Sequence, residues 1–448
     1  MRLDPTDVER RVREAYLRGA PVDLSGRHAD DEAAAVRAEF LVALLLDTAE
    51  KEPGRVARLT VSGARVVGRV DLRDAEITAA VELVDCEFDQ PLDLSGARTR
   101  RLRLSRSRLP GVDLAGCSVE GDLVLDGCHV AGPVRLVRTT VSGLLDLAGA
   151  RLAYADGPAL LADELKVGHN MFCRELRTEG EIRLLGAHVG GDLVLSGARP
   201  ASTAGHALDA GSLVVGRGLF CDRGFTASGD VRLTGVQADV LHLGPVTGTT
   251  DLRHARVRLL RDDPVDSAGV LHLDGLVYEA LDPLVPAPAR LAWLGRQPDG
   301  YRPRPYEQLA VAYRRLGHDA DARRVLLARN RRRRATLPSL SRVWGLLQDW
   351  TVGYGYLPGR ALAWLLCLLA AGTALFANHP PLRVQDRIAF NPVLYTLDLL
   401  LPVLSIGQER AFAPGDPLTQ WSAYLLIAAG WLLATTVTAA LLRTLGRS

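Results

Sequence analysis

Leucines recur at a fixed interval through the first part of the chain. Eight of them lie ten or eleven residues apart: Leu72, Leu83, Leu94, Leu104, Leu114, Leu125, Leu136 and Leu147. Each belongs to a pattern apolar-x-Leu-x-x-small-x-apolar, in which the small residue is Ala, Ser, Cys or Thr. Such short alternating stretches, separated by Gly, Asp and Arg, predict strands rather than helices. A fixed period over many copies predicts a solenoid.

The period continues well beyond these leucines. The same repeat position is next occupied by Ala162, Cys173, Leu184, Leu195, Ala210, Cys221, Leu233, Leu243 and Leu273. A longer duplication is superimposed on it, because "LKVGHNMFCRELRTEGEIRL" recurs 48 residues on as "LVVGRGLFCDRGFTASGDVRL". We therefore predict a mainly β protein, a right-handed parallel β-helix with half-coils of 10–11 residues over residues 57–285. Leucine and the small residue would point inward, and the charged residues outward.

The repeats resemble those of pentapeptide-repeat β-helices, in which a small residue stands two before a large one. Ala75-x-Ile77, Val81-x-Leu83 and Cys86-x-Phe88 show this relation, although five- and six-residue steps alternate here. More broadly, the chain is similar to a group of actinobacterial membrane-anchored proteins often labelled "membrane-associated oxidoreductase". That resemblance implies an enzyme, but the sequence contains no cofactor motif; "GRGLFC" at 216–221 departs from GxGxxG. We expect no catalytic residue, cofactor or metal.

Helical segments flank the repeats, and a solenoid needs caps because its end coils expose apolar edges. Residues 1–56 are predicted to form an N-terminal helical cap, with an amphipathic helix at Asp30–Glu50 that buries Phe40, Leu41, Leu44 and Leu45. Leu291, Trp293 and Leu294 would cover the far end. Residues 286–345 are predicted to form a basic helical connector; Pro305–Arg334 is similar to a single tetratricopeptide hairpin.

The last hundred residues are unusually apolar. Residues 346–448 are predicted to form a membrane domain, with spans at about 361–377 and 421–442 and a re-entrant or interfacial segment at about 391–407. Predicted interface anchors are Arg331, Arg332, Arg333, Arg334, Trp350, Tyr354, Tyr356, Arg360, Trp421 and Arg443. The distribution of arginine predicts a protein of the inner cell membrane, with both termini and the solenoid cytoplasmic and residues 378–420 on the other side.

One string, "TVGYG" at 351–355, matches a potassium-channel filter. It precedes the first predicted span, which is the wrong place for a filter, so we interpret it as a joint. A pore remains an alternative, because the predicted dip ends in Leu404, Ser405, Ile406, Gly407 and Gln408, where a two-helix pore subunit would carry its filter. That alternative describes a channel-like or sensing homo-oligomer.

Composition favours binding over chemistry. The net charge is only +2, and the basic excess is local to residues 281–360, which argues against a general nucleic-acid partner. Cys86, Cys117 and Cys128 fall in the inward small position, where thiols are unreactive. His129 and His188 point outward at equivalent repeat positions and offer at most a weak metal site. We therefore predict a membrane-tethered, non-enzymatic scaffold whose solenoid surface binds a protein partner and whose tail contacts membrane lipids.

Overall fold

The computed structural model describes residues 5–25, 35–46, 58–246, 248–262, 269–298, 300–335, 358–384, 389–401 and 406–445, except the side chains of residues 204, 358–361 and 436–445. The chain consists of two compact units, Met1–Gly317 and His318–Ser448.

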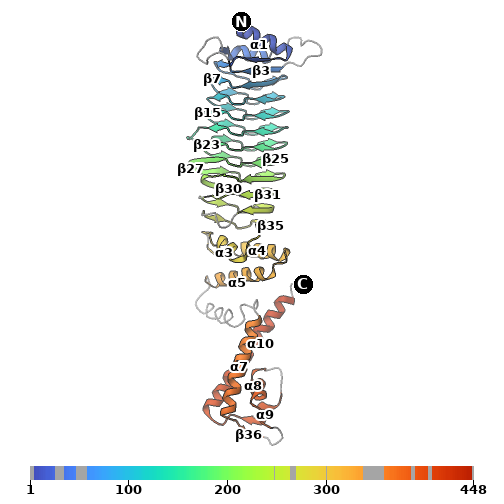
Figure 1. Cartoon of the computed structure of the whole chain (residues 1–448), viewed down its shortest axis with the longest axis vertical. Coiled ribbons are helices and arrows are strands. Elements are labelled where there is room, and N and C mark those ends of the chain that lie inside the picture. The colour runs from blue at the N-terminus through green and yellow to red at the C-terminus, as the bar shows by residue number, and fades with distance from the viewer. Residues whose placement is uncertain are drawn as a thin grey trace. The chain divides into compact units, whose positions relative to one another are not determined.

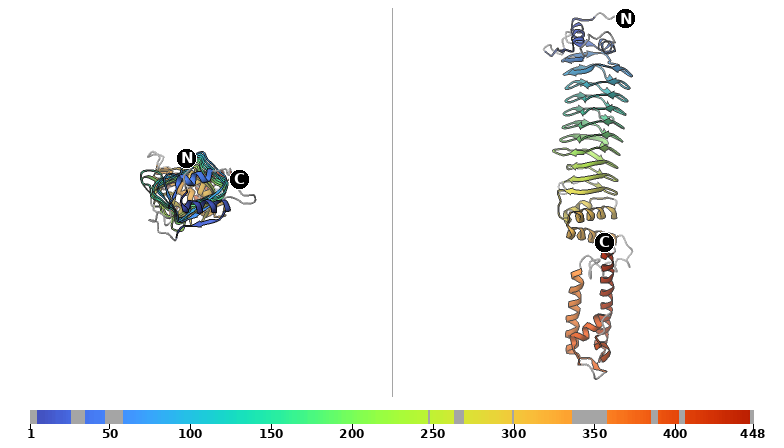
Figure 2. Two further views of the ribbon diagram at one scale, coloured as in Figure 1. Left: turned by 90° about the horizontal axis from the view of Figure 1, so that it is seen from above. Right: turned by 90° about the vertical axis from the view of Figure 1, so that its right-hand side faces the viewer.

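A parallel β-solenoid of about ten turns makes up most of the first unit (Figure 1). One turn shows the pattern: β13 (Ser118–Val119) and β14 (Leu123–Val124) belong to one sheet, and β15 (His129–Val130) and β16 (Val134–Arg135) belong to another. Each strand pairs in parallel with the strand one turn on. Two sheets of 19 and 16 strands result, and their strands stack in register along the solenoid (Figure 2).

Most strands are two to seven residues long, and only β27 reaches eleven. The 19-stranded sheet contains β1 (Pro21–Asp23), β3 (Arg58–Ser62), β5 (Glu76–Ile77), β6 (Ala80–Val84), β9 (Arg98–Thr99), β10 (Leu102–Arg103), β13, β14, β17 (Thr140–Val141), β18 (Leu145–Asp146), β21 (Lys166–Val167), β22 (Met171–Phe172), β25 (His188–Val189), β26 (Leu193–Val194), β28 (Val214–Val215), β29 (Gly218–Cys221), β31 (Gln237–Leu243), β33 (Arg256–Asp262) and β35 (Val277–Asp282). The 16-stranded sheet contains β2 (Ala35–Arg37), β4 (Arg65–Val67), β7 (Glu87–Phe88), β8 (Leu92–Asp93), β11 (Arg108–Leu109), β12 (Val112–Asp113), β15, β16, β19 (Arg151–Leu152), β20 (Leu160–Leu161), β23 (Arg177–Glu179), β24 (Ile182–Arg183), β27 (Arg199–Asp209), β30 (Ser228–Arg232), β32 (Thr250–Asp251) and β34 (Leu271–His272).

The periodic leucines form the core of the solenoid. All eight are buried, none more than 5% exposed, so their predicted inward position is confirmed. A tight turn follows the leucine: the Ala75 N–H donates to the Leu72 carbonyl at 3.2 Å, and Asp74 between them has φ 55°. Gly96 takes the same position one turn on, with φ 72°. Left-handed backbone explains why Gly and Asp recur there.

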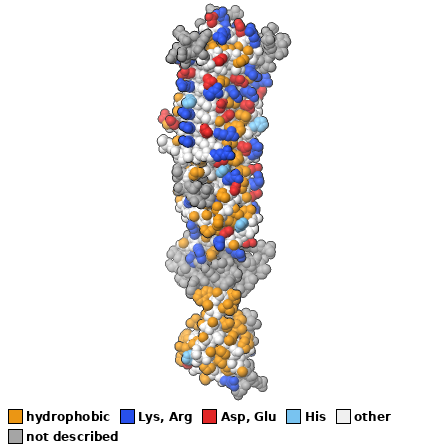
Figure 3. Space-filling model, in the orientation of Figure 1, with side chains coloured by type: hydrophobic (Ala, Val, Ile, Leu, Met, Phe, Trp, Pro, Cys, Tyr) orange, Lys and Arg blue, Asp and Glu red, His pale blue; other side chains and the backbone are white. Residues whose placement is uncertain are grey.

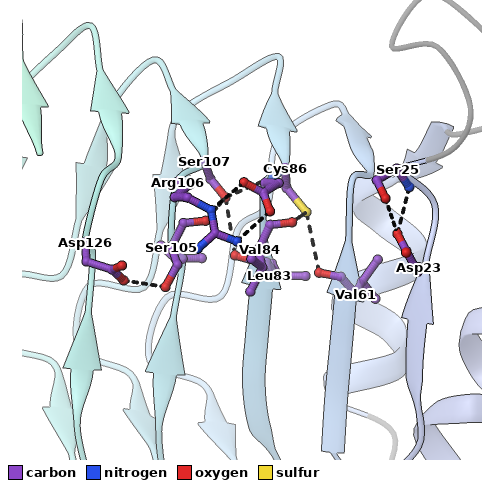
Figure 4. A network of polar contacts seen from close by, with 12 residues as sticks. Asp23, Ser25, Val61, Leu83, Val84, Cys86, Ser105, Arg106, Ser107 and Asp126 are labelled. Atoms are coloured by element: carbon purple, nitrogen blue, oxygen red, sulfur yellow. Dashed lines mark hydrogen bonds and ion pairs between the residues drawn. The ribbon is translucent and has the colours of Figure 1, made fainter. Parts of the chain in front are cut away.

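Polar atoms in the small inward position are satisfied by the neighbouring turn (Figure 4). The Ser107 hydroxyl donates to the Leu83 carbonyl at 3.3 Å and accepts from the Cys86 N–H at 3.0 Å. The Cys86 thiol donates to the Val61 carbonyl of the neighbouring turn at 3.7 Å. Serine and cysteine are therefore compatible with this interior, because backbone groups are within reach of their side chains.

Two helices cover the first turns. Helix α1 (Asp7–Arg18) packs against β1 and β3, and α2 (Ala38–Leu46) packs against β2 and β5. Helix α2 is shorter than the predicted helix at 30–50, because residues 35–37 pair with β4 as a strand. The Glu9 side chain is fully buried, completes a capping box with Thr6, and accepts from Arg37 Nη2 at 2.6 Å. This pair joins α1 to β2.

The other end of the solenoid is closed by α3 (Ala287–Leu294) and α4 (Pro303–Arg315). Arg290 of α3 is fully buried and donates to Asp262 of β33 at 2.6 Å. The Tyr313 hydroxyl of α4 donates to the Val285 carbonyl at 2.6 Å. Leu316, the C-cap residue of α4, is 44% exposed.

The second unit contains α5 (Asp319–Ala335), α7 (Pro358–Asn378), α8 (Pro392–Leu400), α9 (Gln408–Ala411), α10 (Pro417–Leu445) and the antiparallel pair β36 (Leu382–Arg383) and β37 (Phe412–Ala413). Helices α7, α8 and α10 pack together around a shared core. Phe376 meets Tyr395 edge-on, with ring centroids 4.9 Å apart. Gly430 permits close packing, because a Cβ there would lie 2.1 Å from the Leu400 carbonyl oxygen.

The predicted two-helix transmembrane segment is wrong. Residues 361–377 and 421–442 fall within α7 and α10, but in the described part of the chain neither helix is long and apolar enough to cross a membrane. The prediction was based on apolar composition, but part of this apolar sequence forms a protein core. Phe376, Leu399, Leu400 and Leu426 pack against one another across the three helices instead of facing outward.

Candidate functional site

A row of basic side chains follows one outward position of the 16-stranded sheet. It consists of Arg108, His129, Arg151, Arg177 and Arg199, each the parallel partner of the next. All five side chains are exposed. Figure 3 shows a file of Lys and Arg side chains, with a His in it, along the left edge of the solenoid. We call these five residues the basic row.

The arginines of the basic row differ from many arginines elsewhere on the solenoid. Arg106 contacts Asp85 at 2.7 Å, and Arg183 contacts Asp163 at 2.7 Å, in both cases from the neighbouring turn. Within the described ranges, no ion pair or side-chain hydrogen bond joins any arginine of the basic row to another group. The row is therefore a line of basic side chains without short ion pairs in the described ranges. Glu87, the register partner of Arg108, and Glu179, two residues after Arg177, are the acidic residues next to it.

An open groove of about 500 Å³ lies beside the basic row. Arg108, His129 and Arg151 line it together with Ala131 and Ala153, whose small exposed side chains leave the space. Glu87 and Glu179 also line it, and they come from the strands before and after these three basic residues. We call this hollow the groove. It combines an apolar floor with a charged wall that holds two arginines and two glutamates.

One cluster superficially suggests hydrolytic chemistry. The Ser196 hydroxyl donates to Asp222, and His242 Nδ1 lies 3.1 Å from the same carboxylate. A catalytic triad needs histidine between serine and the acid, so that imidazole removes the hydroxyl proton. Here the aspartate lies in the middle. Burial lowers the pKa of His242, but the imidazole does not contact the serine.

The solenoid cysteines are packing residues. Cys86, Cys117, Cys128, Cys173 and Cys221 are buried, as predicted. Burial raises the pKa of the Cys86 thiol to about 11 and that of Cys117 to about 12. Since the thiolate is the nucleophile, these thiols are unreactive at neutral pH.

The two outward histidines noted in the sequence do not meet. His129 lies in β15 of the 16-stranded sheet, and His188 lies in β25 of the 19-stranded sheet. Among the residues that the structure describes, no group of three or more His, Cys, Asp or Glu side chains is placed to hold a metal ion. The structure instead brings His129 between two arginines of the basic row.

The predicted interface anchors are scattered over the second unit. Arg331, Arg332, Arg333 and Arg334 form the last turns of α5, and Trp421 of α10 is 72% exposed. Trp350, Tyr354 and Tyr356, with the TVGYG string, lie outside the described residues, as do the side chains of Arg360 and Arg443.

The predicted pore segment is described only in part. Leu404 and Ser405 lie outside the described residues. The Ile406 N–H donates to the Asp398 carboxylate of α8 at 2.7 Å, and Gly407 is the N-cap of α9 with φ 92°. The buried Gln408 side chain donates to the Ala389 carbonyl at 3.0 Å. These contacts fold the segment back onto α8.

Comparison with known proteins found no match: no protein-family model, no curated protein and no solved structure corresponds to this chain. The choice of the basic row as the candidate site therefore depends on the geometry of this structure alone. A signal for it exists in the sequence, because each member directly follows the small or inward residue of alternate half-coils, as Arg108 follows Ser107 and Arg151 follows Ala150.

Proposed function

We propose that the protein is a non-enzymatic β-solenoid scaffold that binds an anionic protein partner through the groove and the basic row. The observation that carries this proposal is the row of four arginines to which the described residues supply no ion pair. Like charges on neighbouring strands are unfavourable for folding. Their presence in a solenoid that pairs Arg106 and Arg183 with aspartates is explained by a counter-charge on a partner.

The groove supports the same conclusion. Interfaces join a desolvated apolar centre to charged groups that guide association and set its specificity. Ala131 and Ala153 give the groove an apolar floor beside the arginines. Parallel strands that pair turn after turn hold these groups at fixed spacing, so little ordering of the surface is required on binding.

The test is site-specific photo-crosslinking in the native host with the full chain. A crosslinking residue replaces Ala131 on the groove floor, or Thr140, which is exposed on the other sheet. We expect one discrete adduct from position 131, lost when Arg151 and Arg177 are both changed to glutamine, and none from position 140. Equal adducts from both positions, or an adduct that survives the double change, would contradict the proposal. Flavin or nicotinamide absorbance of the purified chain would contradict its non-enzymatic part.

A further inference from the structure

Helix α10 carries two stripes of mainly apolar residues on different sides. The first stripe is buried and advances by steps of four, three, four and three residues: Thr419, Ala423, Leu426, Gly430 and Leu433. It faces α7 and α8, with which α10 packs. Steps that alternate between three and four residues keep side chains on one face of a helix and are the spacing by which one helix packs on another.

The second stripe has the same spacing but is left uncovered by the described residues. Leu418, Trp421, Leu425 and Ala428 follow one another at steps of three, four and three, and Leu432 and Thr435 continue these steps. Tyr424 and Trp431 flank the exposed part. We call Leu418, Trp421, Tyr424, Leu425, Ala428 and Trp431 the outer stripe; its five large side chains are 54–72% exposed. Hydrophobic side chains predominate on the visible face of the second unit (Figure 3).

The spacing and the lack of charge on the outer stripe favour an identical helix as its occupant. Lipid tails contact an apolar face whatever the spacing of its side chains, whereas a second helix requires the alternating three- and four-residue steps. Residues 417–435 contain no Asp, Glu, Lys, Arg or His. A two-fold axis brings the same surface patch of two copies together, so a charged patch would repel its own copy and an uncharged one does not.

The exposed area is large enough for such an interface. A fully exposed aromatic side chain offers about 200 Å², so the exposed parts of Trp421, Tyr424 and Trp431 amount to about 350 Å². Leu418 and Leu425 add about 150 Å². Two copies would therefore bury about 1,000 Å², the size at which specific interfaces begin. A patch of this size on a single chain usually marks an interaction site.

We propose that α10 packs against the α10 of a second copy of this chain along the outer stripe, forming a two-fold homodimer. Trp421 and Leu425 would lie near the centre of the interface, and Tyr424 and Trp431 at its border. This inference does not depend on the basic row or the groove, because every residue of the outer stripe belongs to the second unit.

Sedimentation equilibrium of the full chain tests the proposal with a matched pair of variants. We expect the native chain to have twice the mass of one copy. Leu425→Glu should weaken the dimer at least tenfold, because each copy would bring a buried charge to the interface. Leu366→Glu is the control: Leu366 is an exposed leucine of α7 outside the outer stripe, and its replacement should leave the dimer unchanged.

Thiol labelling supplies a second readout that does not depend on mass. Cys367 is exposed, so the test uses a Cys367→Ser background. With Ala428→Cys, the introduced thiol should react slowly at high protein concentration and faster on dilution, as the dimer dissociates. With Leu366→Cys, the rate should be the same at both concentrations.

Three results would overturn the proposal. The first is a single-chain mass at every concentration, with no concentration dependence of labelling in Ala428→Cys. The second is equal dissociation by Leu425→Glu and Leu366→Glu, which would show that the outer stripe is not the interface. The third is a single chain that binds phosphatidylcholine vesicles and loses this binding in Leu425→Glu, which would assign the outer stripe to a lipid surface.

Discussion

Replacing Arg177 by glutamine should stabilise the solenoid, although arginine replacements at paired positions should destabilise it. Arg177 lies between Arg151 and Arg199, its partners on the two adjacent turns. All three guanidinium groups are charged at any relevant pH, and no ion pair compensates Arg177 within the described residues. Removing its charge relieves a repulsion that is present in the folded chain and largely absent from the unfolded one.

Coulomb's law gives the size of the effect. Two unit charges about 4.8 Å apart repel by about 0.9 kcal/mol in water, so the two neighbours together contribute about 1.7 kcal/mol. Glu179, two residues on in the same strand, lies about 6.7 Å away and attracts Arg177 by about 0.6 kcal/mol. The expected gain is therefore about 1 kcal/mol at low salt. It falls to about 0.7 kcal/mol at about 0.15 M salt, where the Debye length is about 8 Å.

Hydrogen exchange measured by mass spectrometry resolves such a local change in a repeat protein, whose turns open partly independently. Amides of β19 and β23 should exchange about fivefold more slowly in Arg177→Gln at low salt. Arg183→Gln is the matched control, since Arg183 lies on β24 of the same sheet and contacts Asp163 at 2.7 Å. Amides of the strands around Arg183 should exchange faster in Arg183→Gln than in the unchanged protein. Equal acceleration in both variants, or a gain from Arg177→Gln that persists in about 1 M salt, would refute the reasoning.

Three further predictions concern the caps and the thiols. Asp262→Asn leaves the buried Arg290 without its counter-charge and should cost about 3–5 kcal/mol, seen as faster exchange in β33 and β35; a double replacement by apolar residues should recover much of the loss. Burial raises the pKa of Glu9, but hydrogen bonds from the α1 cap and from β2 outweigh it and hold the pKa below its usual value. Glu9→Gln should therefore lower the melting temperature of the first unit at neutral pH, at a cost of about 1–3 kcal/mol. That difference should shrink as the pH falls below 4.5, because protonation removes the same interaction from the native chain. With a thiol reagent at pH 8, Cys367 should react fast and the five buried cysteines, such as Cys86, only after unfolding; rapid modification of a second thiol would contradict the packing.

The turns of the solenoid were predictable because one inward residue per half-coil is large and apolar. Leu104 and Leu125 lie one turn apart at the same inward position, and both are buried. The need for a buried apolar side chain is enough to explain the leucine at this position. The local conformation was encoded only in part: Gly96 takes the left-handed turn position at low cost, but Arg106 and Glu164 take the same position with φ 53° and 55°. The first cap was predicted less well. Its alanine-rich periodicity predicted a helix, whereas Val36 and its two neighbours pair with β4 as a strand.

The basic row was harder to predict, because its members come from alternate half-coils. The steps from Arg108 to His129 and on to Arg151 are 21 and 22 residues, but the next step to Arg177 is 26 because an insertion follows β19. Periodicity locates the inward residues, whereas the assignment of outward residues to one sheet requires the strand register. The membrane prediction failed for a different reason: apolar composition does not distinguish a surface that faces lipid from the core shared by Phe376, Leu399 and Leu426.

A solenoid turns any outward position into a straight line of side chains at strand spacing, so the character of that line follows from one residue per turn. Where Arg183 faces Asp163, the line is neutral and contributes to stability. Where Arg151, Arg177 and Arg199 follow one another, the line carries a field that falls off only over the Debye length of about 8 Å. The sign alternates earlier in the same column, where Glu87 lies in register between Arg65 and Arg108, so the like charges at Arg151, Arg177 and Arg199 are informative. We therefore infer that the basic row meets an external counter-charge, at the expense of about 1 kcal/mol of stability at Arg177, which has an arginine on both adjacent turns.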